Sequence, residues 1–196
     1  MPELKTLQLV SGIPSSTTAT STDVAFRLQS LDLSYHASRT LSPEFFETLF
    51  RRASTSLLRL KFTDRFFNRH PLRAIALPLV QANVKHLDII TMMGTASYNY
   101  EDFTSVTHLT LATDYVCDHL PFFNSLPALT HLTLKTPYPS DLTLVSLSTW
   151  QSLQRLDEIR FVNQDGMDAD LQEVVTKIGL AHVSIVFGHA QSTRIA

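Results

Sequence analysis

Two stretches of the chain decide the fold: VTHLTL at residues 106–111 and LTHLTL at residues 129–134. Each has apolar residues at its first, fourth and sixth positions. The same pattern occurs eight times, and its first positions lie 22 to 29 residues apart. Its apolar residues are Leu4/Leu7/Leu9, Leu28/Leu31/Leu33, Leu57/Leu60/Phe62, Val84/Leu87/Ile89, Val106/Leu109/Leu111, Leu129/Leu132/Leu134, Leu156/Ile159/Phe161 and Leu180/Val183/Ile185. A recurrence of this kind predicts a row of similar short units.

The spacing inside each copy indicates a β-strand. The last two apolar residues are two positions apart, as in a strand that buries one of its faces. The residues between copies must return the chain to the start of the next strand, and parallel pairing requires such long connections, often helical. We therefore predict one parallel sheet with helices or irregular turns on its other side.

Some of the connections have the pattern of an amphipathic helix. Ser42 and Pro43 are suited to the start of a helix, and the four apolar residues within 45–50 share one face. Residues 168–178 repeat this pattern and stop at Gly179. Residues 71–82 and 141–155 have weaker helical patterns, because a proline or β-branched residues interrupt them.

The pattern resembles leucine-rich repeats over residues 4 to about 187. The resemblance implies an α/β fold: a curved right-handed solenoid of about eight repeats, with a parallel concave sheet and helices or irregular turns on the convex side. Many members have Asn or Cys three residues after the last apolar position, and this chain does not. It is most similar to the divergent repeats of fungal F-box-type proteins, and we expect irregular coils. We expect residues 1–196 to form a single leucine-rich repeat domain. Because neither end has a polar capping unit, we also expect this domain to be a fragment of a longer array.

Composition argues against several classes of partner. The chain has 196 residues, a formal net charge of −2 and 44% hydrophobic residues. It lacks the basic charge that nucleic acid attracts and a long apolar run for a membrane. Its single cysteine, Cys117, allows no internal disulfide and no four-thiolate metal site, which suits a reducing compartment. We expect a cytoplasmic or nuclear protein with no nucleic-acid or membrane partner.

Histidine recurs at one position of the repeat. His86, His108 and His131 each precede the middle apolar residue, and His182 has the same place two repeats later. Strand alternation puts them on the solvent side, so we predict a column of imidazoles. Such a column suits pH-sensitive recognition, metal ligation or plain stacking between repeats. Because no carboxylate-rich shell or HExxH helix accompanies it, we expect no metal.

The solvent side of the predicted sheet is polar and mixed in charge. Arg59 and Lys61 next to Asp88 suit either cross-strand ion pairs or recognition of an acidic or phosphorylated partner, and we favour pairing. The residues expected to contact a partner on the concave face are Arg59, Lys61, His86, Asp88, His108, Thr110, His131, Thr133, Glu158, Arg160 and His182.

Signals for catalysis are weak. There is no GxSxG, GxxxxGK[ST] or GxGxxG motif, and the chain has only 5 glycines. Cys117 precedes Asp118 and His119, but adjacent residues seldom place a nucleophile and its base correctly, and a lone cysteine is usually a small buried residue. We predict no catalytic residue, no cofactor and no enzymatic activity.

The predicted function is non-catalytic protein binding, since a stack of strands presents many side chains on a rigid surface. The F-box resemblance implies substrate recognition for a cullin-type ubiquitin ligase, with any adaptor bound through a region outside this chain. LSPEFFETLF, residues 41–50, superficially resembles the opening of an F-box, but its proline is displaced by one position and the segment is needed as a return helix. The alternative is a leucine-rich repeat regulator of a small GTPase.

Overall fold

The computed structural model describes residues 5–9, 27–33, 43–63, 83–91, 103–113, 123, 126–135, 156–163 and 184–189. These residues contain eight strands and one helix. Their bounds are β1 Thr6–Leu9, β2 Ser30–Leu33, α1 Pro43–Ala53, β3 Arg59–Thr63, β4 His86–Thr91, β5 His108–Thr113, β6 His131–Lys135, β7 Glu158–Asn163 and β8 Ser184–His189. No helix in this part of the chain is long and apolar enough to cross a membrane.

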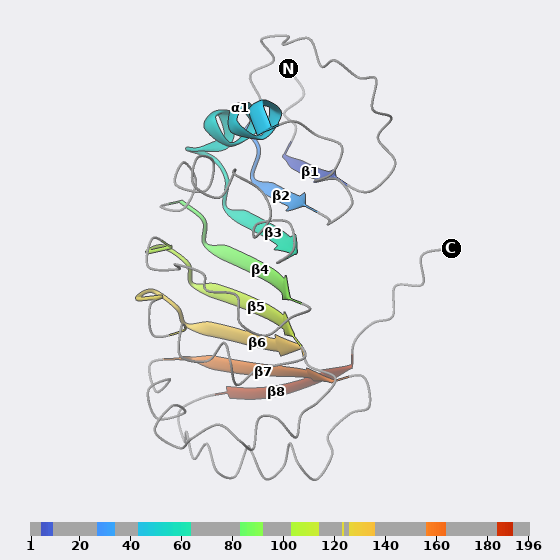
Figure 1. Cartoon of the computed structure of the whole chain (residues 1–196). Helices are drawn as coiled ribbons and strands as arrows, with labels where there is room; N and C mark the ends of the chain where they lie inside the picture. Colours follow the sequence, from blue (N-terminus) through green and yellow to red (C-terminus); the bar gives the residue numbers. More distant parts are fainter. Residues whose placement is uncertain are drawn as a thin grey trace, which may run out of the picture.

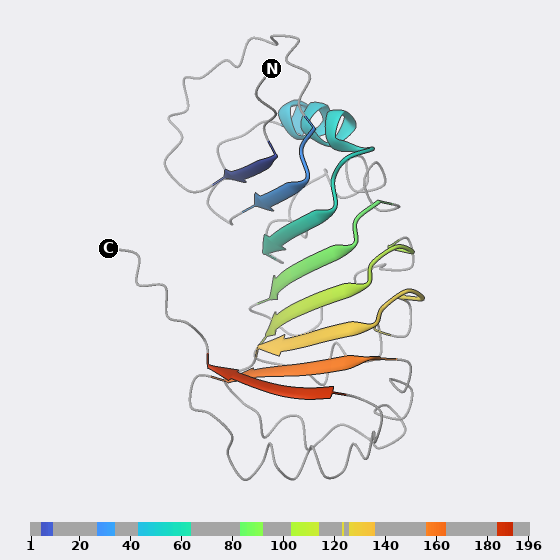
Figure 2. The same ribbon diagram turned by 180° about the vertical axis from the view of Figure 1, so that it is seen from behind.

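The strands form one sheet in the order of the sequence. Each pairs in parallel with the next, from β1 to β8. Figure 1 shows them stacked with their arrows pointing the same way, and Figure 2 shows the same stack from behind. The predicted parallel sheet is confirmed. The number of complete repeats stays a prediction, because most of the connections lie outside the described residues.

The first seven strands pair in the register that the repeat pattern predicts. One row across the sheet consists of Thr6, Ser30, Arg59, His86, His108, His131 and Glu158. The next residue along each strand from β2 to β7 points inward and is at most 1% exposed: Leu31, Leu60, Leu87, Leu109, Leu132 and Ile159. Two further rows, led by Leu28 and Leu33, are buried in the same way. Each such side chain stabilises the fold by at most about 1.5–3 kcal/mol.

The eighth strand corrects the sequence prediction. The repeat pattern aligns Val183 and Ile185 with the apolar pair of β7, whereas in the structure Ile185 pairs with Ile159 and Phe187 with Phe161. A slip of two residues keeps every side chain on its own side of the sheet, so alternation alone cannot choose between the two registers. Ser184, not His182, therefore lies beside Glu158.

Main-chain bonds hold the starts of the strands together. The carbonyl just before each strand from β1 to β6 accepts two successive N–H groups, from the first residue of the next strand and the residue before it, at 2.8–3.2 Å. The accepting carbonyls belong to Lys5, Gln29, Leu58, Lys85, Thr107 and Thr130. This repeating arrangement keeps the strand starts in register without an asparagine ladder. The coils, which we expect to be irregular, lie mostly outside the described residues.

Helix α1 confirms the predicted return helix over residues 43–50 and extends it to Ala53. Leu49, Phe50 and Ala53 lie on one face and are at most 5% exposed. On the exposed side, Arg51 pairs with Glu47 at 2.6 Å, one turn earlier. The basic residues of the last turn, Arg51 and Arg52, also stabilise the helix through their interaction with its dipole. The predicted helices at 71–82, 141–155 and 168–178 lie outside the described residues.

Candidate binding surface

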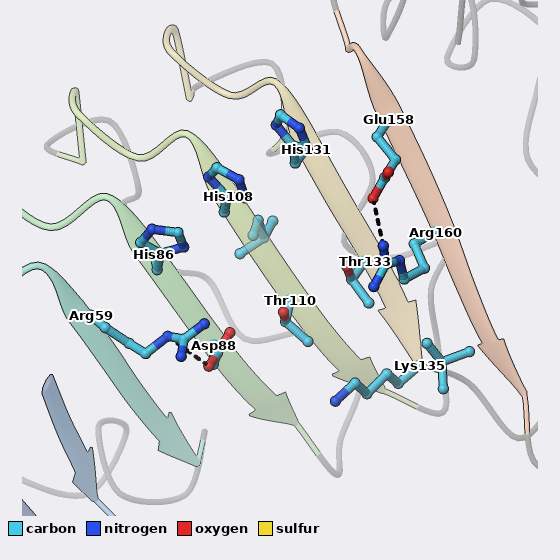
Figure 3. Close-up of a pocket in the computed structure, with 12 residues that line it drawn as sticks. Arg59, His86, Asp88, His108, Thr110, His131, Thr133, Lys135, Glu158 and Arg160 are labelled. Atoms are coloured by element: carbon cyan, nitrogen blue, oxygen red, sulfur yellow. Dashed lines mark ion pairs between the residues drawn. The ribbon is translucent and has the colours of Figure 1, made fainter. Parts of the chain in front are cut away.

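The side of the sheet opposite the leucine rows, here called the outward face, has a depression of about 680 Å³ across β3 to β7. Figure 3 shows its side chains, which come from five neighbouring strands. They are Arg59, His86, Asp88, His108, Leu109, Thr110, His131, Thr133, Lys135, Glu158, Arg160 and Val162. Nine of the eleven residues predicted to contact a partner are in this set.

The first residues of β4, β5 and β6 are histidines, and their imidazoles form the histidine column: His86, His108 and His131. Strand pairing places them side by side. The rings of His86 and His108 stack with centroids 4.4 Å apart at 30°, and those of His108 and His131 with centroids 4.2 Å apart at 11°. The predicted column is therefore present for these three residues (Figure 3). His182 lies outside the described residues.

Two threonines orient the column. The Thr107 hydroxyl donates to the Lys85 carbonyl at 3.3 Å and contacts Nδ1 of His108 at 2.9 Å. In the next strand, the Thr130 hydroxyl donates to the Thr107 carbonyl at 3.3 Å and contacts Nδ1 of His131 at 2.8 Å. Because a hydroxyl has a single proton, it must accept from the ring when it donates to the carbonyl. When the hydroxyls donate to these carbonyls, the ring proton is on Nδ1 and Nε2 carries the lone pair, whereas a hydroxyl that donates to Nδ1 leaves the ring proton on Nε2.

The environment of His86 and His108 favours their neutral form. Partial burial lowers the pKa of His86 below its ordinary value, the Arg59 guanidinium lowers it further, and the Asp88 carboxylate opposes both. Partial burial also lowers the pKa of His108, aided by the two neighbouring imidazoles, whereas the Glu158 carboxylate opposes the change. Two adjacent rings therefore resist protonation near pH 7.

Two ion pairs flank the column, and the one between Arg59 and Asp88 was favoured from the sequence. Arg59 lies 3.9 Å from Asp88, and Arg160 lies 3.3 Å from Glu158 on its own strand. Lys61 differs from expectation: its Nζ contacts Asp32 at 2.8 Å, on the side away from β4. The side chains of these pairs are partly exposed to solvent. Each pair therefore stabilises the fold by at most about 1 kcal/mol.

Three residues of the depression were not predicted from the sequence. Lys135 and Val162 occupy the next outward position, beyond the pair of outward residues considered in each repeat. Continuing the alternation by two residues would have found both. Leu109 is an inward residue that reaches the floor of the depression. Lys135 is exposed and has no ion pair among the described residues.

The lining therefore contains the cations Arg59, Lys135 and Arg160 and the carboxylates Asp88 and Glu158. With neutral imidazoles, the depression has a slight excess of positive charge. No cluster of three or more metal-ligating residues occurs in the part of the chain that the structure describes. Cys117 lies outside that part. The depression can offer hydrogen bonds and charges to a ligand, together with imidazoles that can gain protons.

Comparison with known proteins supports the fold. No family model matches the chain, and no curated protein does either. Among solved structures, the chain is similar to the leucine-rich repeat-containing protein LegL7 from Legionella pneumophila, with a TM-score of 0.52 and 19% sequence identity. The match covers 83% of this chain and 56% of LegL7. Together with the parallel sheet in chain order, it shows a leucine-rich repeat solenoid fold.

Proposed function

We propose that the chain is a non-catalytic protein-binding module that contacts its partner through the outward face of β3 to β7. One observation carries the proposal: the two sides of the same strands differ completely. The inward residues are almost all apolar and are buried, whereas most of the outward residues around the depression of about 680 Å³ are polar, varied and partly exposed. Core packing explains the composition of the inward side. It leaves the outward face free for recognition.

The outward face is suited to a partner of protein size. Its side chains lie on five hydrogen-bonded strands, so little order has to be gained when a partner binds. Its polar composition is typical of contacts that form and dissociate. Leu58 is the one large apolar residue that is exposed among the described residues, and it precedes β3.

A finer form of the proposal is substrate recognition for a cullin-type ubiquitin ligase in the cytoplasm or nucleus. Resemblance to divergent fungal F-box-type repeats supports it. The adaptor would bind a region outside this chain, because residues 43–50 belong to α1. Regulation of a small GTPase is the alternative, and the identity of the captured partner distinguishes the two.

Site-specific photo-crosslinking tests the proposal. A photoreactive amino acid replaces Thr110 in the depression or, as a matched control, exposed Thr104 before β5. In extract of the native cells, we expect a discrete crosslinked protein from position 110 and none from position 104. Crosslinking to a ligase subunit or its substrate supports substrate recognition for a ubiquitin ligase. Crosslinking to a GTPase that is recovered only with bound nucleotide supports regulation of a small GTPase. Equal crosslinking from both positions, or none from position 110, contradicts the proposal.

A further inference from the structure

The histidine column has a feature that simple stacking does not require. Thr107 and Thr130 hold Nδ1 of His108 and His131, at 2.9 and 2.8 Å. When each threonine donates to a carbonyl, the neutral ring keeps its proton on Nδ1 and has only a lone pair on Nε2. In this tautomer the rings can donate a hydrogen bond from Nε2 only after they gain a second proton.

A carboxylate accepts hydrogen bonds and cannot donate them. At Nε2 of His108 or His131 it would meet a lone pair unless the ring became an imidazolium. With the hydroxyls donating to the carbonyls, binding a carboxylate there takes up a proton, because the other neutral tautomer requires each hydroxyl to leave its carbonyl and donate to Nδ1. His86 differs, because Lys85 precedes it and no hydroxyl fixes its Nδ1 among the described residues.

In the free column, His86 and His108 resist protonation for a second reason. Its rings are 4.2–4.4 Å apart, so one imidazolium disfavours the next. An anion lying along the column would offset this repulsion. Affinity for that anion and proton uptake are then linked, and each increases the other.

The surrounding charges favour an anion over a cation. The carboxylates of Asp88 and Glu158 lie on either side of the column, and each is already paired with an arginine. Lys135, on β6, adds a positive charge with no ion pair among the described residues. The charged groups around the column are Arg59 on β3, Lys85 and Asp88 at β4, Lys135 on β6, and Glu158 and Arg160 on β7.

We propose that the histidine column binds an acidic peptide segment of a protein partner and takes up protons at His108 and His131 as it does so. The inference rests on the proposed function and specifies its partner chemistry. The rings of His108 and His131 are 4.2 Å apart, so one carboxylate can accept hydrogen bonds from both, and the next carboxylate on that side of an extended peptide, roughly 7 Å away, is left for the cations of the lining. The lining has few cations and contains no Phe, Tyr or Trp on which nucleic-acid bases would stack.

The test measures binding of a hexaglutamate peptide, labelled with a pH-insensitive dye, to the full chain at pH 7.5 and 5.5. We expect Kd to fall at least about fivefold at the lower pH, because binding is linked to protonation. Calorimetry in buffers of different ionisation enthalpy should show uptake of up to about two protons. Hexaglutamine should not bind.

Variants separate the column from general charge. In H108N/H131N the amides cannot titrate, so the pH dependence of Kd should fall below about twofold. R27Q removes an exposed cation before β2, and this variant should retain the pH dependence of Kd. T107V/T130V frees Nδ1, so the neutral rings can place a proton on Nε2, and proton uptake should decrease while binding at pH 7.5 persists. T104V is the matched control for the loss of a hydroxyl. Circular dichroism confirms that each variant is folded.

The alternative anion gives a different profile. Phosphoserine loses charge between pH 7.5 and 5.5, so a phosphopeptide should show a flatter pH dependence than hexaglutamate. Tighter binding of a phosphoserine peptide or of a single-stranded oligonucleotide would overturn the proposal. So would a pH-independent Kd for hexaglutamate, or pH dependence that survives in H108N/H131N. Crosslinking from position 110 that persists despite such results would leave the protein-binding function standing.

Discussion

The two sides of strands β4 to β6, which pair in parallel in one register, differ in their side chains. On the inward side, Leu87, Leu109 and Leu132 repeat one residue type and are at most 1% exposed. On the outward side, the column of imidazoles is half-exposed and is followed by a row of mixed residues. The inward side determines how the strands stack. The outward side can change without loss of the fold, and it is where binding chemistry can be placed.

The largest effect is expected from a change on the inward side. Leu109→Ala removes a side chain from the middle of the leucine rows and should lower the free energy of unfolding by about 2–5 kcal/mol. Its neighbour Thr110→Ala, on the outward side, should change it by about 0.5 kcal/mol or less. Chemical denaturation measures both. Equal losses from the two variants would contradict the division between the sides.

A smaller effect is expected from the threonines that orient the column. Thr130→Val keeps the shape of the side chain and removes its contacts with the Thr107 carbonyl and with His131. We expect a loss of about 1 kcal/mol in the free energy of unfolding, because the hydroxyl is partly buried. Thr104→Val, in an exposed turn, should be neutral. Denaturation curves for the two variants make the comparison.

The pH dependence of stability should be smaller still. The pKa values of His86 and His108 are lowered in the folded chain, so the unfolded chain binds more protons. Their contribution is fully present above the unfolded pKa of about 6.5 and is lost as the pH falls below it toward the folded pKa. Solvent screening keeps the effect modest, since the rings are partly exposed.

Thermal unfolding between pH 7.5 and 5.5 checks this prediction. The melting temperature of the wild type should fall with pH, and the slope should decrease in H86N/H108N. A melting temperature that rises as the pH falls would contradict the assigned sign. Above pH 5.5 most carboxylates stay ionised, so they contribute little to the slope.

The smallest expected effect concerns the ion pair between Lys61 and Asp32, outside the depression. Its Nζ and carboxylate oxygen are 2.8 Å apart and the two side chains are 39% and 23% exposed. A double-mutant cycle with Lys61→Met and Asp32→Asn should give a coupling of about 0.2–1 kcal/mol that decreases with added salt. A coupling that is unaffected by salt would argue against a solvent-screened pair.

Much of the fold could be predicted because burial leaves a periodic trace in the sequence. The inward rows led by Leu31 and Leu33 follow directly from the alternation of apolar residues. The eighth strand could not be placed, because Val183/Ile185 and Ile185/Phe187 satisfy the same alternation. Choosing between them requires the contacts of the neighbouring strand.

The candidate surface could be predicted in outline for the same reason. Alternation identified the column and most of the depression, but the strands extend farther than the repeat pattern, so Lys135 and Val162 were missed. The threonine contacts depend on side-chain geometry, although the repeated THLTL at 107–111 and 130–134 marks where they occur. The pairing of Lys61 was unpredictable because a carboxylate stands on either side of it in the register.

The most direct test of the binding surface is a nuclear magnetic resonance titration of the isotopically labelled full chain with hexaglutamate at pH 6. The ring nitrogens report their own protonation, and the backbone amides report the site. We predict that Nε2 of His108 and His131 becomes protonated on binding, with amide changes at β3 to β7 centred on the histidine column. Unchanged ring nitrogens, with amide changes at α1 or elsewhere outside the depression, would contradict the account.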